Sequence, residues 1–449
     1  MHKRTLIRNA HIVNEGRTYV GSVTIDGDRI EEVIEGRDCS PIVPPDETIE
    51  ADGLWLLPGI IDTHVHFREP GMTAKGDFES ESRAAIAGGV TTVLDMPNVK
   101  PATTTPETLA EKMALARKKC HVNYGFYYGA TADNAATLAH LNPREVCAIK
   151  LFMGSSTGNL LVEDAQALHT IFAQSRLPIV VHCEDTALVE RNMAECRATE
   201  GADPDIHFHS VVRDDEVCYR STKQAVELAL ATGARLHVAH VSTARELRLL
   251  SSKAGEGQIT AEACLPHLLF TTDDYAKRHA YIKCNPAVKS AKDRDALRRA
   301  LTTGVVTTVG TDHAPHLLRE KQGGAARALS GMPLIQFSLP AILDLVSSGV
   351  LTLPRLAALM CHGPADTFSI EGRGYIRAGY KADLVLVRPQ QPWTLTPNHI
   401  LSKCGWSPLE GHTFGWRVEK TWCNGYLLYN NGHLTDEGFI GQMITYHRH

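Results

Sequence analysis

The sequence predicts an α/β fold, in which a (β/α)8 barrel stands beside a small composite β-sandwich domain formed by both termini. Three features of the 449-residue chain predict it. Both ends alternate β-branched runs with turn signals, the middle alternates short apolar strands with helical segments, and polar residues follow the middle strands. Because helices between strands indicate a parallel sheet, eight such units fit a closed, TIM-like barrel.

The β domain is expected to combine two distant parts of the chain. Its first part is residues 1–54, where "SVTIDGDRIEEVIEG" contains the hairpin signal Asp26-Gly27. Its second part is residues 365–449, where "GRGYIRAGYKADLVLV" and "VEKTWCNGYLLYNNGHL" repeat the same pattern. The barrel, residues 55–364, is therefore predicted to be an insertion between the two.

Eight candidate strands run through the predicted barrel, with helical segments such as "PETLAEKMALARKK" between them. In chain order they are "LPGIIDTHVHF", "VTTVLDMPN", "HVNYGFYYGA", "VCAIKLFMG", "PIVVHCE", "RLHVAHVS", "ITAEACLPHLL" and "VVTTVGTDHAPH". Catalytic residues of such barrels lie at the carboxyl ends of the strands. The polar residues that fall there are His64, His66, Asn98, Lys150, His182, His240 and Asp312.

The stretch "DTHVHFREPG" places His64, His66 and Arg68 at every second position after an apolar run. Such side chains share one face of a strand, so two imidazoles and a guanidinium converge, which indicates a metal beside an anion. One histidine at a strand end is more often a hydrogen-bonded core residue than a ligand. Four histidines and an aspartate at the ends of separate strands favour a metal centre instead.

Lys150 stands between apolar neighbours in "CAIKLFMG". An unpaired buried ammonium costs several kcal/mol, so either a carboxylate pairs with Lys150 or CO2 converts its amine to a carbamate that bridges two metals. The second hypothesis predicts two Zn²⁺ ions roughly 3.5–4 Å apart with a bridging hydroxide. Asp312 is then both a ligand and the catalytic residue that takes the proton as an amide-like bond is hydrolysed.

Arg68 and Asn98 are left over once the ligands are assigned, and both can donate to a substrate carboxylate. The alternatives are an ion pair of Arg68 with Glu69 or Glu79, and a turn role for Asn98. Two further histidines of "TDHAPH", His313 and His316, can also touch a substrate. The Gly- and Ala-rich segment "REKQGGAARALSGMP", within the loop 317–333, is expected to be mobile.

The composition favours a small-molecule substrate. A net charge of -5 with scattered signs gives no case for nucleic acid or an anionic membrane. The start "MHKRTLIRNAHIVNEG" lacks an apolar signal core, and no apolar run is long enough to span a bilayer, so a cytoplasmic location is expected. Eleven dispersed cysteines argue against disulfides and a thiolate zinc site. A homo-oligomer is compatible with a barrel of this size, although no sequence feature establishes it.

The chain resembles the dihydroorotases of the amidohydrolase superfamily over essentially its whole length. The motifs are "PGIIDTHVHFREPG", "GGVTTVLDMPN", "IKLFMGSSTG", "VVHCE", "HVAHVST", "KCNPAVKS", "VGTDHAPH", "KADLVLV" and "KCGWSPLEG". The resemblance implies two zinc ions and reversible interconversion of L-dihydroorotate and N-carbamoyl-L-aspartate in de novo pyrimidine (UMP) biosynthesis. It implies the metal ligands His64, His66, carbamylated Lys150, His182, His240 and Asp312, and the substrate contacts Arg68, Asn98, Asn285 and His316.

The chain departs from the family pattern in two places. It reads "NPAVKS" where many dihydroorotases read "NPPLR", with Lys289 where an arginine is usual, so the contacts of that loop stay open. It reads "SGMPLIQFSLP" where many relatives have "GLET", so backbone contacts from Gly331 and Met332 stay open as well. Lys150 is itself informative, because some dihydroorotases carry an aspartate there and bind metal differently.

Two other functions compete with this interpretation. An allantoinase or hydantoinase-type cyclic amidase resembles the chain at the ligands and in "GWSPLEG", but usually lacks "HFREPG". A non-catalytic scaffold homologue for another pyrimidine enzyme would be marked by missing ligands, and none of the six is missing here. Association with aspartate carbamoyltransferase is left open by the sequence.

Overall fold

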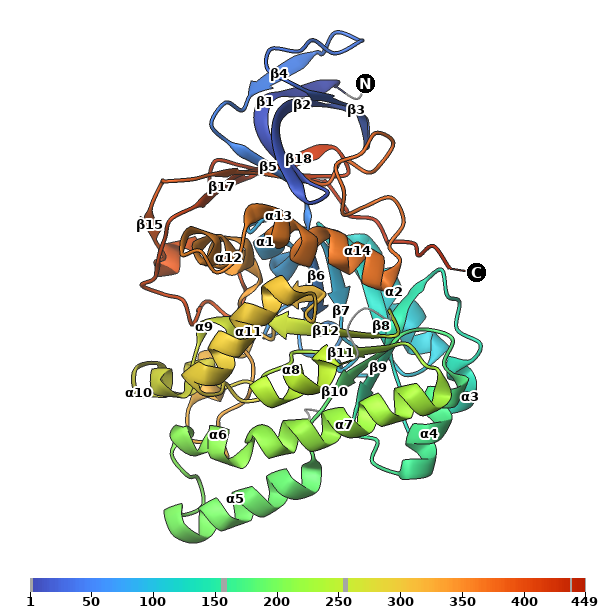
Figure 1. The fold of residues 1–449 in the computed structure, drawn as a ribbon, viewed down its shortest axis with the longest axis vertical. Coiled ribbons are helices and arrows are strands. Elements are labelled where there is room, and N and C mark those ends of the chain that lie inside the picture. Colours follow the sequence, from blue (N-terminus) through green and yellow to red (C-terminus); the bar gives the residue numbers. More distant parts are fainter. Residues whose placement is uncertain (1–2, 155–159, 253–256, 437, 449) are drawn as a thin grey trace.

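In the computed structural model, residues 3–154, 160–252, 257–436 and 438–448 are described. The described chain contains an eight-stranded parallel sheet surrounded by helices and a nine-stranded sheet built from both ends of the chain. The nine-stranded sheet lies at one end of the molecule, above the barrel in Figure 1. The predicted α/β barrel with a separate domain from both termini is confirmed.

All eight predicted barrel strands are present, and they pair in sequence order from β6 to β13. Their bounds are β6 (Ile60–Val65), β7 (Val90–Asp95), β8 (Asn123–Gly129), β9 (Val146–Phe152), β10 (Ile179–His182), β11 (Leu236–Val238), β12 (Ile259–Cys264) and β13 (Thr308–Gly310). The barrel closes where the His66 N–H donates to the His313 carbonyl at 2.8 Å. Short strands with every residue buried, such as β7, explain the apolar runs in the sequence.

Helices follow the strands and cover the outside of the barrel (Figure 1). They are α1 (Phe78–Ala87), α2 (Pro106–Lys119), α3 (Ala135–Leu138), α4 (Ala165–Gln174), α5 (Thr186–Glu200), α6 (His209–Val212), α7 (Asp215–Thr232), α8 (Ala244–Ser251), α9 (Leu265–Leu269), α10 (Tyr275–Arg278), α11 (Ala291–Thr303), α12 (Ser338–Ser347), α13 (Leu353–Ala357) and α14 (Gly363–Phe368). Capping boxes at Asp77 and Thr105 fix where α1 and α2 begin. Within the described residues, no helix has the length and apolarity to cross a bilayer.

The terminal sheet has the strand order β19-β18-β17-β14-β5-β1-β2-β3, and β4 pairs with β1. Its strands are β1 (Thr5–Asn14), β2 (Arg17–Asp26), β3 (Arg29–Glu35), β4 (Glu47–Glu50), β5 (Trp55–Pro58), β14 (Leu384–Arg388), β17 (Arg417–Cys423), β18 (Tyr426–Asn430) and β19 (His433–Leu434). β5 joins the two halves, because it pairs with β1 on one side and β14 on the other.

β5 lies at the domain boundary that is expected near residue 55. The run "LWLLPGII" crosses two elements: Trp55–Pro58 pairs within the terminal sheet, and the barrel begins with β6. Gly59 separates them where a Cβ would lie 2.2 Å from the Thr91 hydroxyl, so only glycine fits this close approach. We therefore place the boundary at Gly59.

The tail that is expected after the C-terminal part of the β domain returns to the barrel. The Gly441 N–H donates to the Cys120 carbonyl, and the Ile444 N–H donates to the Tyr124 carbonyl. Ile444 and Tyr446 are buried in one apolar cluster with strand residues such as Tyr127. Residues 440–448 therefore pack on the barrel although the preceding strands belong to the terminal sheet.

Candidate active site

The carboxyl ends of the barrel strands surround one cavity. Nine of the ten predicted site residues line it, namely His64, His66, Arg68, Asn98, Lys150, His182, His240, Asn285 and Asp312. These residues come from six strands or the loops that follow them, and from the loop before α11. The barrel thus brings together side chains that are up to 248 positions apart, as between His64 and Asp312.

His64, His66 and Asp312 form the first group with the geometry of a metal site. Their ligand atoms all lie within 4.8 Å of one another. Oδ1 of Asp312 is 3.4 Å from His64 Nε2 and 3.2 Å from His66 Nε2. Two nitrogen or oxygen ligands of one tetrahedral zinc lie about 3.3 Å apart, given bonds of about 2.0–2.1 Å. The three residues therefore fit a divalent metal.

His182 and His240 form a second group. Nδ1 of His182 lies 3.0 Å from Nε2 of His240, again close to the spacing of two ligands on one zinc ion. Burial lowers the pKa of both rings, so they are held as neutral imidazoles, the form that binds metals. No described residue offers the buried Nδ1 of His240 a hydrogen-bond partner.

Lys150 differs sharply from Lys112, which is also fully buried. Both are 0% exposed, but Nζ of Lys112 is 2.6 Å from the Asp95 carboxylate and also donates to a carbonyl. Nζ of Lys150 has no hydrogen-bond partner among the described residues and lies 5.2 Å above the Phe152 ring. Burial lowers the pKa of Lys150 to about 8, which increases the share of neutral amine at pH 7. The salt-bridge alternative therefore lacks a partner, and a neutral amine is the form that CO2 can modify.

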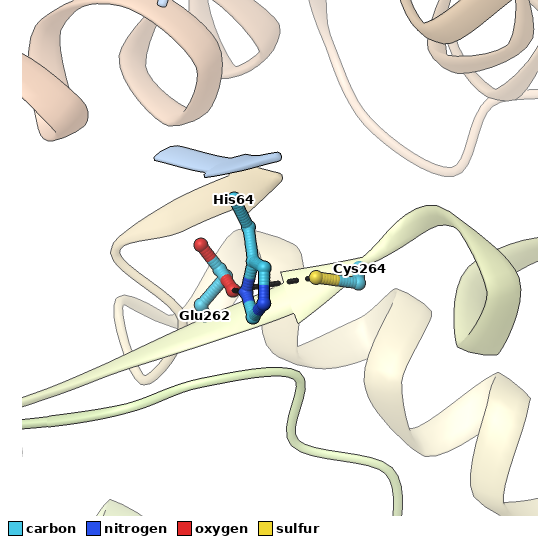
Figure 2. Close-up of side chains that lie close together, drawn as sticks. All are labelled: His64, Glu262 and Cys264. Carbon is cyan, nitrogen blue, oxygen red and sulfur yellow. Dashed lines mark hydrogen bonds and ion pairs between the residues drawn. The ribbon is translucent and has the colours of Figure 1, made fainter. Parts of the chain in front are cut away.

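Two buried carboxylates that the sequence interpretation passed over contact the predicted histidine ligands. Glu262 Oε1 lies 2.7 Å from His64 Nδ1 and also accepts from the Cys264 thiol, as Figure 2 shows. Glu184 lies 3.0 Å from His182 and pairs with Arg213. Carboxylates on the outer nitrogen fix the orientation of ligand histidines. A charged residue inside an apolar strand, such as Glu262 in "ITAEAC", is the sequence signal for this role.

The group formed by His64, Glu262 and Cys264 also has a metal-like spacing (Figure 2). Its donor atoms, however, are already used, because Glu262 Oε1 binds both the His64 ring and the Cys264 thiol. Burial, reinforced by Glu262, holds the pKa of Cys264 well above its usual range, so the sulfur stays a thiol. These contacts favour a supporting role for this group beside the candidate metal site formed by His64, His66 and Asp312.

We expect Glu262→Gln to weaken zinc binding by about 10–100-fold, because the amide no longer orients His64 through a charged hydrogen bond. Competition with a chelator of known affinity measures this change. Glu419→Gln is the matched control, since Glu419 is also buried but pairs with Arg388 in the terminal sheet. Unchanged zinc affinity in the Glu262 variant would contradict the support role.

Arg68 is a buried cation with no carboxylate partner among the described residues. It is 4% exposed, its Nε donates to the Pro315 carbonyl, and its Nη2 lies 3.1 Å from His316 Nε2. The alternative ion pairs are absent, because Glu69 binds Lys119 and Glu79 binds Arg83. Burial lowers the pKa of Arg68 to about 10, so the guanidinium is still charged at neutral pH. It can accept an anion in the cavity.

Three cavity residues hold a left-handed backbone conformation: Arg68 at φ 68°, His240 at φ 36° and Asp312 at φ 49°. For residues other than glycine this conformation is uncommon and costs on the order of 1–3 kcal/mol. Such costs are tolerated where the surrounding structure holds a side chain in a required position. The coincidence with three site residues supports a functional role for them.

The other predicted contacts divide into two kinds. Asn98 faces the cavity, but its Oδ1 lies 2.7 Å from His66 Nδ1, so it also orients a ligand. Asn285 lines the cavity and accepts a hydrogen bond from Ser330. His316 is not among the lining residues and lies behind Arg68. Gly331 lines the cavity.

Several neighbouring residues have structural roles. His313, expected as an alternative substrate contact, binds Glu81 at 2.8 Å through Nε2 and accepts from the Leu334 N–H, so both ring nitrogens are used. Met332 is buried and pairs with His313 across a β-bridge. Lys289 is buried outside the cavity lining, and its Nζ donates to the Ala287 carbonyl. In "IKLFMGSSTG", residues 155–158 lie outside the described part of the chain.

The loop 317–333, whose mobility stays a prediction, makes many hydrogen bonds within itself and to its neighbours. Asp203 accepts from the backbone N–H groups of Gly324, Ala326 and Arg327. Nζ of Lys321 donates to three backbone carbonyls, those of residues 283, 329 and 331. Small residues here allow the backbone to lie close to its partners, so glycine content signals close packing.

Comparisons with known proteins agree with this geometry. The profile of the Amidohydrolase family matches residues 55–428. A dihydroorotase from Halobacterium salinarum is 34% identical over 91% of this chain and 92% of its own length. An allantoinase from Bacillus velezensis is 29% identical over 98% of this chain and 97% of its own. The L-hydantoinase structure from Arthrobacter aurescens covers 99% of this chain and 100% of its own, with 26% identity and a TM-score of 0.92.

Proposed function

The chain belongs to the amidohydrolase family, and we propose that it is a dihydroorotase that interconverts L-dihydroorotate and N-carbamoyl-L-aspartate in pyrimidine biosynthesis. It is a cyclic amide hydrolase, as are its dihydroorotase and hydantoinase relatives. The observation that carries the choice of substrate is Arg68, a buried guanidinium beside the metal ligands with no described carboxylate partner. A ring that bears a carboxylate supplies that partner.

The enzyme is metal-dependent, and we assign it two zinc ions. His64 and His66 would hold one ion and His182 and His240 the other, with Asp312 on the first and the carbamate of Lys150 shared. The spacing of the donor atoms and the partnerless amine of Lys150 support this assignment. Bound zinc lowers the pKa of its water to about 7 and polarises a carbonyl.

Arg68 and Asp312 have different roles in the proposed reaction. Arg68 binds the substrate carboxylate and so fixes the ring with its amide carbonyl over the centre. In the hydrolytic direction a water oxygen adds to that carbonyl, Asp312 takes the released proton, and the ring C–N bond breaks as the proton passes to the nitrogen. His64 and His66 outweigh the effect of burial and hold the pKa of Asp312 below its usual range, so its carboxylate is ionised at neutral pH and has a free site for a proton.

A second candidate is a cyclic amidase for neutral rings, because the allantoinase relative and the L-hydantoinase fold both cover nearly the whole chain. The two functions share the metal ligands and differ in what Arg68 does. The comparison that separates them is kcat/KM for L-dihydroorotate, allantoin and a simple hydantoin on one zinc-replete preparation. We expect a preference for dihydroorotate of about 10²-fold or more.

Replacing Arg68 with Met should remove that preference. Loss of one partner of a buried charge pair costs about 2–5 kcal/mol, so we expect kcat/KM for dihydroorotate to fall about 10²-fold. Hydrolysis of the neutral hydantoin should change little. If the variant keeps full activity on dihydroorotate, or if the wild type prefers a neutral ring, the proposal is wrong and the cyclic amidase replaces it.

The cellular location, the partner and the oligomeric state of the enzyme are considered next to its reaction. We propose a cytoplasmic location, which is supported by eleven free cysteines, ten of them buried, since disulfides are rare in reducing compartments. Its partner is a small-molecule substrate, as for the relatives. The homo-oligomer stays a prediction, and analytical ultracentrifugation of the zinc-loaded enzyme tests it.

A further inference from the structure

Arg68 has no carboxylate partner, although three carboxylates lie near enough to act on its charge. Burial lowers the pKa of Arg68, and the negative charges of Asp312, Asp95 and Glu320 work against that effect. Each of the three has its own partner, namely the predicted ligands His64 and His66 for Asp312, Lys75 for Glu320 and Lys112 for Asp95. Arg68 is therefore left available to an anion in the cavity.

The pair of Asp95 and Lys112 is closed to solvent. Both side chains are 0% exposed, whereas the side chain of Glu320 is 25% exposed. Nζ of Lys112 lies 2.6 Å from Oδ2 of Asp95, and no described residue donates another hydrogen bond to that oxygen. Charges in a buried setting are screened little. Without Lys112, the charge of an ionised Asp95 would therefore act strongly on Arg68.

The same pair contacts the backbone of two segments that carry site residues. Oδ1 of Asp95 accepts a hydrogen bond of 2.8 Å from the N–H of Phe67, the residue directly before Arg68. Nζ of Lys112 also donates to the Met96 carbonyl at 2.6 Å, two positions before Asn98. Neither Asp95 nor Lys112 is among the residues that line the cavity. The pair can therefore act on the site through its charge and through the backbone, without contact with a substrate.

We propose that Lys112 is a positioning residue whose charge neutralises Asp95, so that Arg68 stays available to the substrate. This inference rests on the proposed function for the identity of the anion. Without Lys112, an ionised Asp95 would attract Arg68 and repel the carboxylate of the substrate. Loss of the Asp95 charge would have no such effect, because the charge that remains is positive. The two partners of one ion pair therefore differ in what their removal does to substrate binding.

Kinetics of two single variants of the zinc-loaded enzyme give the first test. Lys112→Met leaves a negative charge, whereas Asp95→Asn leaves a positive one and keeps an oxygen for the N–H of Phe67. We expect Lys112→Met to raise KM for dihydroorotate about tenfold with little change in kcat, because carboxylate binding is equal in the ground and transition states. Asp95→Asn should not raise KM, and turnover of a neutral hydantoin should be unchanged in both. A purely structural pair predicts the same loss in both variants, and that result would overturn the proposal.

A double variant keeps the test valid if Lys112→Met folds poorly. Lys112→Met combined with Asp95→Asn removes both charges, and replacing a whole buried ion pair by neutral groups often costs little stability. We expect KM of the double variant for dihydroorotate to return close to the wild-type value. A raised KM in the double variant or in Asp95→Asn would mean that the contacts of the pair matter and its charge balance does not, which would overturn the proposal.

Calorimetric binding of two unreactive rings gives a second test that does not depend on turnover. Orotate and uracil differ by one carboxylate, so their affinities for the zinc-loaded enzyme isolate the binding of that group. We expect Lys112→Met to weaken orotate binding about tenfold and to leave uracil binding unchanged. Arg373→Met is the matched control, because Arg373 also forms a buried ion pair, with Asp383, and neither residue lines the cavity. That variant should lose stability without losing affinity for orotate.

The two proposals fail in different ways. A wild type that turns over a neutral ring faster than dihydroorotate, and binds uracil as tightly as orotate, would overturn the proposed function. A wild type that prefers dihydroorotate and orotate, but whose Lys112→Met variant binds orotate equally well, would overturn only the role of Lys112. A selective loss of orotate affinity in Lys112→Met, with none in Asp95→Asn, would support the proposal.

Discussion

Lys150→Met is expected to lower kcat/KM for dihydroorotate by about 10⁴-fold or more. Methionine fills the same space but cannot form a carbamate, so the two metal groups lose the ligand that they would share. A centre with one weakly held metal forfeits both the activated water and the polarised carbonyl. Kinetics and metal analysis by mass spectrometry measure the two effects together. A variant that keeps two zinc ions and most of its rate would contradict the assignment.

In the metal-free protein, Lys150→Met should not lower the stability, although it lowers the activity of the zinc-loaded enzyme. Nζ of Lys150 is buried without a described hydrogen-bond partner, so replacing it with Met removes an unfavourable group. We expect the melting temperature of the metal-free variant to equal or exceed that of the wild type. Lys112→Met is the contrast, because it leaves the buried carboxylate of Asp95 unpaired and should cost about 3–5 kcal/mol. Stability lost equally in both variants would mean that Lys150 is structural.

Added short carboxylates test whether the enzyme needs a carbamate at Lys150. Lys150→Ala leaves a space where formate, acetate or propionate can replace the carbamate, which is itself carboxylate-like. We expect these anions to restore part of the activity of the zinc-loaded Ala variant, and chloride at equal concentration to restore none. Rescue of Lys150→Met should be weaker, because the methionine side chain occupies the space.

The sequence could bring the candidate metal ligands to one cavity because two structural rules are simple. Alternate residues of a strand share a face, which brings His64 and His66 together, and strand ends of a parallel barrel meet at one rim, which adds His182, His240 and Asp312. Both rules use only the positions of residues along each strand and the order of the strands in the chain. The same rules predicted the strands themselves, because barrel strands are buried on both faces.

Features that depend on pairing between distant residues were not predictable in the same way. Glu262 and Glu184 act through contacts that depend on how neighbouring side chains pack in the barrel. β5 belongs to the terminal sheet because it pairs with β1, more than 40 residues earlier, and with β14, more than 320 residues later. The loop 317–333 is bound by Asp203 and Lys283, which lie outside it and whose positions its own composition does not reveal. The local sequence determines the spacing of apolar and polar residues along each element. The roles of Glu262, Glu184 and β5 depend on tertiary contacts instead.

Asp312→Asn should lower kcat about 10³–10⁴-fold while zinc stays bound. The amide keeps the size of the side chain and one oxygen beside His64 and His66, but it cannot take a proton at neutral pH. Loss of a positioned base typically costs about 10²–10⁴-fold, and the upper part of this range is expected because Asp312 also delivers the proton to the leaving nitrogen. The measurement is kcat at saturating dihydroorotate with the zinc content determined on the same sample.

The control for this variant is Asp203→Asn, which alters a partly buried aspartate that binds the loop 317–333 and is not among the residues that line the cavity. We expect that variant to keep the metal and to lose far less activity. If Asp312→Asn keeps both its zinc and most of its rate, proton transfer must pass through another group. If it loses zinc, the ligand role of Asp312 is supported, and its role as a base must be measured at zinc concentrations that refill the site.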